Sequence, residues 1–300
     1  MVTLTTILLV NPAAGHGRAD RLAAAAESAA RRVFAPVERI DTTAPGAAVG
    51  IVRQAVEQGA VRILVLGGDG TLHEAANGLL QAQGVERPPL GIIPAGTGND
   101  FAKLCGTARL TPEIAVERLA RGRIVRLDVG EGWGEYFLNS IGVGFDAEVA
   151  HRLARMKHGR GLPAYLLTVI RTLASRETFE AEVEAGANSF RDRLLLLEVG
   201  NGPVVGGGFH ITPHARPDDG QLDICAIQDM PIPMILLKLP LVMLGRHLGL
   251  RQVRHFRCER LVIKSAAGPL RAQFDGEVRS RPGALEIRVL PGALPMMFAE

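Results

Sequence analysis

Cysteine, tryptophan and tyrosine are scarce in this sequence. Its 300 residues include three Cys, one Trp and two Tyr. The cysteines (Cys105, Cys225 and Cys258) are far apart and show no C-x-x-C spacing. They predict neither a disulfide framework nor a cysteine metal site, so a reducing, cytoplasmic compartment is the simpler expectation. Because few aromatic side chains are available to stack on bases, nucleic acid is not an expected partner.

The sequence also has no hydrophobic run long enough to span a bilayer. The apolar stretch 232–244 is short and is interrupted by two prolines and a lysine, whereas a spanning helix needs about 20 apolar residues. We expect this stretch to pack in the core, with interfacial membrane contact as the alternative. The first apolar run, 4–10, has no basic flank, so it predicts a first strand and not a signal peptide.

Two nucleotide-binding signatures are absent and a third is weak. The sequence has no G-x-x-x-x-G-K-[ST] segment and no H-R-D with D-F-G, which excludes a P-loop NTPase and a protein kinase. The segment 142–147 matches G-x-G-x-x-A, but no βαβ series surrounds it. We therefore expect a turn packed close to a neighbouring segment there, and not a dinucleotide site.

What the sequence does have is the composition of a folded protein, with 47% hydrophobic and 22% charged residues and a net charge of +3. Its first third alternates strand and helix patterns joined by glycine-rich turns. This alternation predicts an α/β domain, a doubly wound parallel sheet with helices on both faces. The predicted strands are 7–10, 37–41, 62–66 and 90–94, and the predicted helices are 19–33, 47–58, 71–81 and one opening near residue 99.

After about residue 125 the sequence pattern changes to short segments of β character separated by turn signals. This change predicts an α/β domain over 1–125 followed by a second domain, 126–289, that is a mainly antiparallel β-sandwich. The predicted strands are 124–129, 136–141, 179–184, 194–199, 222–227, 261–264 and 285–289, and the predicted helices are 147–155 and 164–175.

The strongest local signal is the G-G-D-G-T segment Gly67–Thr71, directly after the strand 62–66. Thr71 and Glu74 fit a capping box, which predicts a helix that begins at Thr71. Free N–H groups at a helix N-terminus attract anions, and glycines let a phosphate chain come close. Beside a phosphate, Asp69 would need an intervening Mg²⁺ or a general acid/base role. The alternative is a merely tight strand-to-helix turn.

The segment Pro94–Phe101 repeats this arrangement after the next predicted strand. It supplies glycines, a hydroxyl that can contact a phosphate, and an acid, Asp100, that can hold a metal. Two such loops on neighbouring strands could hold opposite sides of one nucleotide. The segment Asn11–Gly17 is a third glycine-rich crossing, although it would be a weak signal alone.

Two turns in the second half carry acids. In Pro217–Gln221, Asp219 and nearby main-chain carbonyls could hold a hard cation, with a solvated β-turn as the alternative. In Phe274–Glu277, the glutamate could act as a general base if its geometry suits. From the residues alone, a plain hairpin turn is the preferred interpretation of the second pattern.

Together these residues resemble the diacylglycerol kinase catalytic-domain family, especially the small bacterial lipid kinases that share its fold with sphingosine and ceramide kinases. The resemblance spans nearly the whole chain and rests on six segments in order. They are Asn11–Gly15, Gly67–Thr71, Gly96–Phe101, Asn139–Gly142, Asp218–Asp223 and Asp275–Glu277.

The resemblance implies an enzyme that uses ATP and Mg²⁺ to phosphorylate a lipid hydroxyl, most simply converting diacylglycerol to phosphatidic acid. The resemblance also implies an ATP contact from Thr42 or Thr43. Thr42 is preferred because the family places a Thr four residues before a Gly, as Thr42 stands to Gly46. The implied ATP contacts are Asn11, Pro12, Ala13, Ala14, Gly15, Thr42, Gly67, Gly68, Asp69, Gly70, Thr71, Leu72, His73 and Thr97.

Metal and catalytic roles also follow from the resemblance. Asp69 and Asp100 are implied to bind or position the catalytic Mg²⁺, with Asp128 acting through water, and Glu277 to accept the proton of the lipid hydroxyl. A structural Mg²⁺ site is implied at Asp219 with the main-chain oxygens of Arg216 and Gln221. The last strand, 290–300, is expected to complete the first domain.

The expected partners are a membrane lipid as substrate, the membrane surface through peripheral contact, and a second copy of the chain in a homodimer. Three alternatives stay open. NAD kinase carries a similar G-G-D-G loop, although the segment Gly96–Phe101 fits lipid kinases better. A sphingoid-base kinase and a non-catalytic lipid-binding protein of the same fold are the others.

Overall fold

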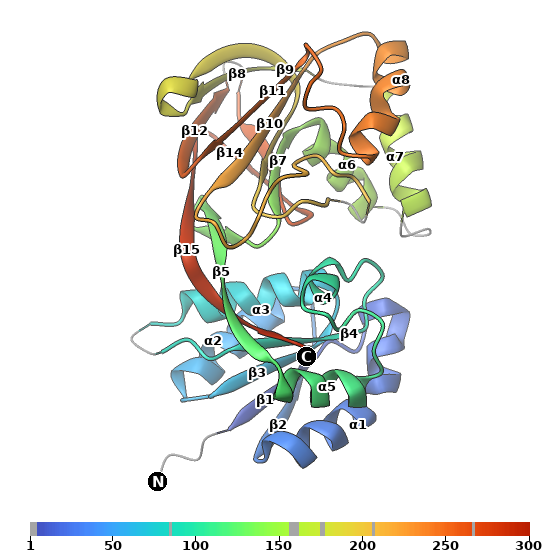
Figure 1. The fold of residues 1–300 in the computed structure, drawn as a ribbon, viewed down its shortest axis with the longest axis vertical. Helices are drawn as coiled ribbons and strands as arrows, with labels where there is room; N and C mark the ends of the chain where they lie inside the picture. Colours follow the sequence, from blue (N-terminus) through green and yellow to red (C-terminus); the bar gives the residue numbers. More distant parts are fainter. Residues whose placement is uncertain (1–4, 84–85, 156–161, 175–177, 206–207, 266–267) are drawn as a thin grey trace. The chain divides into compact units, whose positions relative to one another are not determined.

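The computed structural model describes residues 5–83, 86–155, 162–174, 178–205, 208–265 and 268–300. The chain forms two compact units, shown in Figure 1: residues up to Leu127 together with Gly292–Glu300, and residues Asp128–Pro291. Strands β5 (Arg123–Gly132) and β15 (Leu285–Phe298) contribute residues to both units. The first unit holds a parallel sheet and the second an antiparallel one, which confirms the predicted fold class.

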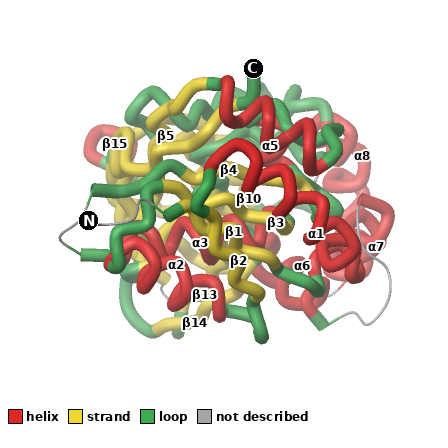
Figure 2. Tube along the Cα trace, turned by 90° about the horizontal axis from the view of Figure 1, so that it is seen from below, coloured by secondary structure: helices red, strands yellow, loops and turns green. Residues whose placement is uncertain are grey.

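The first unit is built on a parallel sheet with the strand order β4-β3-β1-β2. All five residues of β1 are buried, because a parallel sheet covered on both faces takes continuous apolar runs. Figure 2 shows α1 and α5 on one face of this sheet and α2 and α3 on the other. The bounds are β1 Thr6–Val10, α1 Ala14–Phe34, β2 Val37–Asp41, α2 Ala47–Glu57, β3 Arg62–Gly67, α3 Asp69–Gln81, β4 Leu90–Pro94, α4 Asp100–Leu104 and α5 Pro112–Arg121.

The register of these strands brings their carboxyl ends to one edge. Val10 is opposite Leu66, and Gly67 is opposite Pro94. The three glycine-rich segments follow β1, β3 and β4, so the sheet delivers them to the same place. In parallel sheets this edge is where ligands bind.

One helix of the first unit, α5, was not predicted, and another, α1, starts irregularly. The spacing did not predict α5, although Thr111 caps it by accepting a bond from the N–H of Ile114 at 3.5 Å, and Pro112 occupies its first position. In α1, Gly15 to Gly17 all have positive φ, so the regular helix begins after them, close to the predicted residue 19.

The predicted capping box at Thr71 and Glu74 is wrong. Helix α3 begins at Asp69, with Gly68 as its N-cap residue. The Glu74 carboxylate accepts bonds from the N–H groups of Gly46, at 3.0 Å, and Ala48, at 3.2 Å, so it caps the N-terminus of α2 instead. The sequence pattern thus identified Glu74 correctly as an acid that caps a helix. The helix that it caps is α2, however, and not α3, to which Glu74 belongs.

Replacing Glu74 by alanine should lower the free energy of unfolding by about 1 kcal/mol, because two N–H groups at the start of α2 lose their acceptor. Urea denaturation would measure the loss. Glu57→Ala, at the other end of the same helix, is the matched control and should change little. An equal loss in both variants would show that the cap is not what Glu74 contributes.

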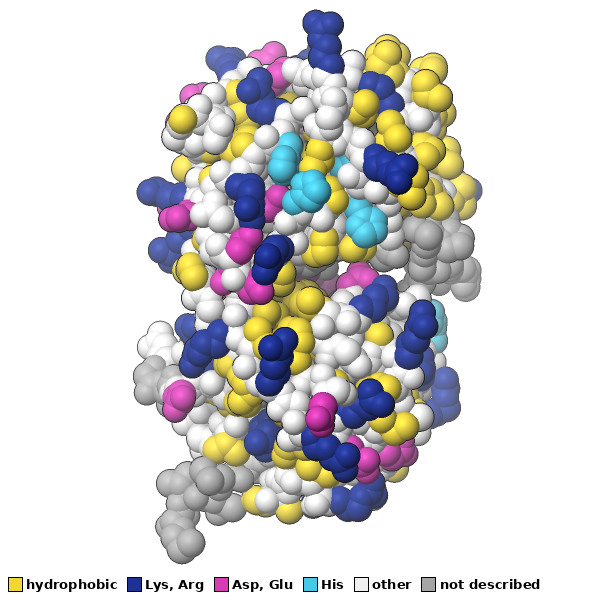
Figure 3. Space-filling view, viewed as in Figure 1, with side chains coloured by type: hydrophobic (Ala, Val, Ile, Leu, Met, Phe, Trp, Pro, Cys, Tyr) yellow, Lys and Arg dark blue, Asp and Glu magenta, His cyan; other side chains and the backbone are white. Residues whose placement is uncertain are grey.

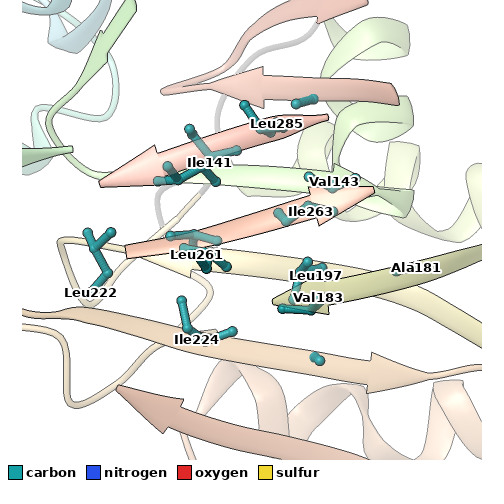
Figure 4. Close-up of a cluster of buried hydrophobic side chains, with 14 of the residues drawn as sticks. Ile141, Val143, Ala181, Val183, Leu197, Leu222, Ile224, Leu261, Ile263 and Leu285 are labelled. Carbon is teal, nitrogen blue, oxygen red and sulfur yellow. The ribbon is translucent and has the colours of Figure 1, made fainter. Parts of the chain in front are cut away.

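The second unit is antiparallel throughout its described pairings, with the order β14-β13-β7-β9-β8-β12-β15, and with β10 between β9 and β11. Figure 4 shows its core, where Ile141, Leu197, Ile224 and Leu261 come from four different strands. The bounds are β6 Glu135–Phe137, β7 Ser140–Gly144, α6 Phe145–Ala154, α7 Leu162–Ala174, β8 Phe179–Glu184, a 3-10 turn Gly186–Asn188, β9 Phe190–Gly200, β10 Leu222–Gln228, α8 Ile232–Met243, β11 Val253–Cys258, β12 Arg260–Ser265, β13 Leu270–Phe274 and β14 Glu277–Arg281.

Helices α6, α7 and α8 cover the other face of this sheet. Side chains alternate along a strand, so Leu197 and Val199 of β9 lie in the core while Leu196 packs in a second apolar cluster. That cluster includes Val149 of α6 and Val169 of α7, with residues of α8 packed against it.

Several predictions for this unit need correction. The predicted strand 136–141 is two strands, because the N–H groups of Leu138 and Asn139 donate to the Asp275 carboxylate. Strands β11, β13 and β14 were not predicted. The predicted last residue of the second helix, Ser175, lies outside the described residues. The turn predicted over 142–147 is instead the end of β7 and the start of α6. The predicted close packing is confirmed, since a Cβ built at Gly142 would lie 2.3 Å from Asp146 Oδ2.

The prediction that 232–244 packs in the core is also wrong. None of the twelve residues of α8, all of which the structure describes, is buried. One side of the helix packs on the second apolar cluster through Ile235 and Leu239, but Leu237 is 78% exposed and Leu244, just past the helix, 65%.

Candidate functional site: the carboxyl edge of the parallel sheet and the Asp-Gly-Glu turn

Three glycine-rich segments touch one another at the carboxyl edge of the parallel sheet. A Cβ at Gly96 would lie 2.5 Å from Gly68 Cα, and a Cβ at Gly15 would lie 2.0 Å from the Ala95 carbonyl oxygen. The Asn11 amide donates to Thr71 Oγ1 at 2.9 Å, which ties the first segment to the start of α3. Side chains at these glycines would separate the segments, so the sequence uses glycine where the backbones meet.

Asp69 and Asp100 are brought to one point of this edge. A Cβ at Gly98 would lie 3.0 Å from Asp69 Oδ2 and 3.9 Å from Asp100 Oδ2, so both carboxylates face that glycine. Asp69 Oδ1 accepts a bond from the N–H of Phe101 at 3.1 Å, and Lys103 pairs with Asp100 at 2.7 Å. The family resemblance implied that both acids bind or position Mg²⁺, and the structure brings them close together.

Burial raises the pKa of Asp69 above its ordinary value, and the negative charge of Asp100 adds to this effect. The backbone N–H groups of Phe101, Asn99 and Asp100 oppose the rise by donating to the carboxylate. A buried acid next to a second acid is stabilised in its charged form by a cation. The pair therefore fits a hard divalent ion such as Mg²⁺, which prefers carboxylate oxygens.

The remaining predicted ATP contacts differ in how accessible they are. Thr97 is exposed, and Thr42 is partly exposed where its N–H donates to the Val10 carbonyl, beside the end of β1. The Leu72 side chain is fully buried and its N–H donates to Gly68. His73 is 4% exposed and contacts Asn77. ATP contacts by the Leu72 and His73 side chains thus stay predictions, and the burial of both side chains does not favour them.

The turn around Asp219 belongs to the second unit. The Asp219 carboxylate accepts bonds from the Arg257 guanidinium and from the N–H of Gln221, at 3.1 Å for the latter. The Asp128 carboxylate accepts a bond from the N–H of Gly220 at 2.6 Å and so anchors the same turn. A cation would compete with Arg257 for the Asp219 carboxylate. As arranged, these donors do not fit Mg²⁺, and the structural metal site stays a prediction.

No group of three or more His, Cys, Asp or Glu side chains is arranged around a common metal position within the described ranges. Arg216 directs its guanidinium to the neighbouring Asp218 at 3.2 Å. The carboxylate pair of the first unit is therefore the donor set that best suits a cation.

Glu277 is presented by a tight hairpin between β13 and β14. Phe274 pairs with Glu277 across the turn, and the two turn residues, Asp275 and Gly276, have φ of 47° and 96°. The Glu277 side chain is 59% exposed, and its carboxylate lies 3.7 Å from the Arg279 guanidinium. An accessible carboxylate on a rigid turn can accept a proton from a bound hydroxyl.

Asp275 holds this turn in place, a role that was not predicted although the residue lies in the segment Asp275–Glu277. Its carboxylate accepts bonds from the N–H groups of Leu138 at 2.7 Å, Asn139 at 2.9 Å and Ser140 at 2.9 Å. Its own N–H donates to the Ser140 carbonyl at 3.0 Å. These bonds stabilise the left-handed conformation that a non-glycine residue otherwise avoids.

The second unit also contains an apolar cavity of about 80 Å³ under α8. Its walls come from α6, β9, β10 and α8, through side chains such as Leu196, Ile227 and Leu239. Asp146, Lys238 and His247 are the polar side chains that line it. Such a cavity accepts a hydrocarbon chain more readily than a nucleotide.

Comparisons with known proteins agree over both units. A model of the diacylglycerol kinase catalytic domain matches residues 5–132, and a model of the YegS C-terminal NAD kinase beta sandwich-like domain matches residues 139–298. A probable lipid kinase, YegS-like, of Pseudomonas fluorescens is 34% identical over 265 residues, covering 84% of this chain and 85% of the relative. A diacylglycerol kinase of Mycobacterium tuberculosis is 30% identical over 293 residues, covering 93% of each.

Solved structures share the fold. A diacylglycerol kinase structure from Bacillus anthracis matches with a TM-score of 0.74 at 22% identity, over 99% of this chain and 98% of that chain. A second structure from the same organism gives a TM-score of 0.81 at 27% identity, over the same shares.

Proposed function

The chain belongs to the family of diacylglycerol kinases and YegS-like lipid kinases, and on that basis we propose that it transfers the γ-phosphate of Mg²⁺-bound ATP to a lipid hydroxyl, with diacylglycerol as the acceptor. The observation that carries the proposal is the meeting of three glycine-rich segments with Asp69 and Asp100 at the carboxyl edge of the parallel sheet.

The first unit binds and orients the nucleotide in this proposal. Backbone N–H groups at the start of α3 and in Gly96–Gly98 face the phosphates, because helix N-termini and glycine-rich turns attract anions. Asp69 and Asp100 would hold Mg²⁺, which would supply charge neutralisation at the phosphates. Phosphoryl transfer has a loose, highly charged transition state, so positioning and charge neutralisation supply most of the catalysis.

The second unit supplies the base. Glu277, on the turn held by Asp275, accepts the proton of the attacking lipid hydroxyl. The hydroxyl oxygen forms the new bond to the γ-phosphorus as the bond to the β–γ bridging oxygen breaks, and ADP leaves with that oxygen.

Exposed apolar side chains support a membrane lipid as the substrate. Leu237 and Leu244 lie at or near α8, and Ile170 on α7 is 50% exposed. Figure 3 shows hydrophobic side chains gathered on the side of the second unit where Figure 1 places these helices, at the upper right. None of the helices in the described ranges is long and apolar enough to cross a membrane. We propose peripheral contact through this surface.

The test is transfer of label from γ-labelled ATP, with Mg²⁺, to detergent-dispersed diacylglycerol, ceramide, a sphingoid base and monoacylglycerol, with NAD as a further acceptor. We expect labelled phosphatidic acid. A labelled sphingoid or ceramide phosphate alone would replace diacylglycerol as the acceptor. Labelled NADP alone would refute the lipid-kinase proposal in favour of NAD kinase, which the description of the second matched domain mentions.

A further inference from the structure

A row of polar side chains crosses the helix-covered face of the second sheet. Gly142 of β7 is opposite Gln273 of β13 on one side and Glu198 of β9 on the other. Glu198 is in turn opposite Cys225 of β10. Residues paired across neighbouring strands point to the same face, so Gln273 and Glu198 flank the space above a residue with no side chain. Leu197, the neighbour of Glu198, lies on the opposite face in the core.

Two carboxyl groups share that space. A Cβ at Gly142 would lie 2.8 Å from Glu198 Oε2 and 2.3 Å from Asp146 Oδ2, so both acids reach over the same glycine. Glu198 is fully buried and Asp146 is 5% exposed. Among the described residues neither oxygen of Glu198 has a hydrogen-bond partner of normal geometry. Two ionised carboxylates would repel each other strongly there, and one proton held by the pair removes the repulsion.

The groups around Glu198 do not supply a compensating positive charge. Asp146 faces it from α6, Asp275 from the turn after β13, and Cys225 from β10. His247 contacts Cys225 at 3.5 Å, and its buried position lowers its pKa, which favours the neutral ring. No lysine or arginine in the described part of the chain forms an ion pair with Glu198.

The burial of Glu198 and its acidic neighbours both favour its protonated form. Burial, followed by the charge of Asp146, raises the pKa of Glu198 well above its ordinary value of 4.5. The neighbouring Ser140 hydroxyl opposes the rise. The neutral acid is therefore the form that this site accommodates.

The polar row ends at the turn that carries Glu277. Gln273 Oε1 accepts a bond from the N–H of Gly276 at 2.6 Å, which closes the turn from inside. The other end of that amide, Nε2, is buried and has no partner of normal geometry among the described residues, and neither has Ser140 Oγ. Buried donors of this kind seek acceptors, and the acceptors across Gly142 are the oxygens of the carboxyl pair.

We propose that Glu198 is a positioning residue for Glu277: as a neutral acid paired with Asp146 it supports the Gln273 side chain, which fixes the turn. Loss of the shared proton places two negative charges behind the turn and displaces it. The proposal rests on the proposed function in one respect, the role of Glu277 as the base.

The kinetic test compares Glu198→Gln with Glu198→Ala in the intact protein. Glutamine has the shape of the neutral acid, so Glu198→Gln should keep kcat within about threefold of the parent. Glu198→Ala removes one acid of the pair and leaves a cavity, so it should lower kcat by about 10²-fold, the effect expected of a small displacement of a catalytic group. KM for ATP should stay unchanged in both, because the proposed nucleotide contacts lie in the first unit. Glu182→Gln, an exposed acid on β8, is the control.

The pH profile separates positioning from simple structural support. In the parent, kcat should fall as pH rises through the raised pKa of the pair, because the shared proton is lost. In Glu198→Gln this fall should be absent, apart from changes also seen in the control. The protonation of Glu198 should affect the stability of the fold in the same direction as it affects kcat. Its contribution to the free energy of unfolding is fully present below the ordinary pKa of 4.5 and is lost as pH rises through the raised pKa.

Two readouts do not need lipid-kinase activity. The infrared difference spectrum of the parent minus Glu198→Gln at neutral pH should contain the C=O stretch of a protonated carboxylic acid. Amide exchange at Gly276 should be faster in Glu198→Ala and unchanged in Glu198→Gln. If no substrate were phosphorylated, these two results would still decide whether the proton and the turn are linked. A missing acid band, or full kcat with an unchanged pH profile in Glu198→Ala, would overturn the proposal.

Discussion

Asp69→Asn should lower kcat for phosphoryl transfer by about 10³-fold, because it removes a charge from the pair that we propose to hold Mg²⁺ against the phosphates. The replacement has nearly the same shape. Its side-chain oxygen can still accept the bond from the Phe101 N–H that Asp69 accepts at 3.1 Å. The loss should therefore come from the charge and not from the loop.

The fold should survive this change. Burial raises the pKa of Asp69, which means that the folded protein disfavours its charged form. A neutral amide should leave thermal stability equal or slightly higher when measured without Mg²⁺. Circular dichroism melts, together with the Mg²⁺ dependence of the rate, provide the measurement. Asp20→Asn, an exposed acid on α1, is the control and should keep full activity. Normal turnover in Asp69→Asn would exclude it as a metal ligand.

Glu277→Gln should lower kcat by about 10²–10⁴-fold, the usual contribution of a positioned base, while KM for ATP stays near its parent value. The amide cannot accept the proton of the lipid hydroxyl. The side chain is 59% exposed and its ion pair with Arg279 is long, at 3.7 Å. Its replacement should therefore change the free energy of unfolding by less than about 1 kcal/mol.

The matched control for this change is Glu286→Gln. Glu286 is also an exposed glutamate on a strand of the second unit and also pairs with an arginine, Arg260, at 3.0 Å. It should leave kcat unchanged. If both variants lost the same activity, a general effect of charge would explain the result and Glu277 would not be the base.

The first unit could be predicted closely because its signals are local. The strands β2 and β4 have the predicted bounds, since each is a short run of strand-forming residues between turn or helix signals. The carboxyl-edge rule then placed the three glycine-rich turns at one edge, and the two acids that the family resemblance assigned to Mg²⁺, Asp69 and Asp100, lie close together there. Helix α5 was not predicted, although Thr111 and Pro112 together are a usual sequence signal for the start of a helix.

The second unit could be predicted only in part because its strands depend on distant partners. Strand β11 reads V-R-H-F-R-C, which has no clear apolar period, and it is stabilised by pairing with β10. Asp275 binds N–H groups about 135 residues away in the chain, and nothing near it in sequence announces those bonds. Glu198 did leave one signal, a single acid inside the apolar run L-L-L-L-E-V-G of β9.

Strand β15 makes the completion of the first unit depend on the prior synthesis of the second unit. Met297 is buried in the first unit's core, Ala299 donates its N–H to the Cys105 carbonyl, and the Phe298 carbonyl packs against Gly122. These residues leave the ribosome only after all of Asp128–Pro291 has been made. Domains often fold in the order of synthesis, but here the N-terminal half must wait for its last strand. The nascent chain thus cannot complete the first unit before the unit that carries Glu277 has been synthesised.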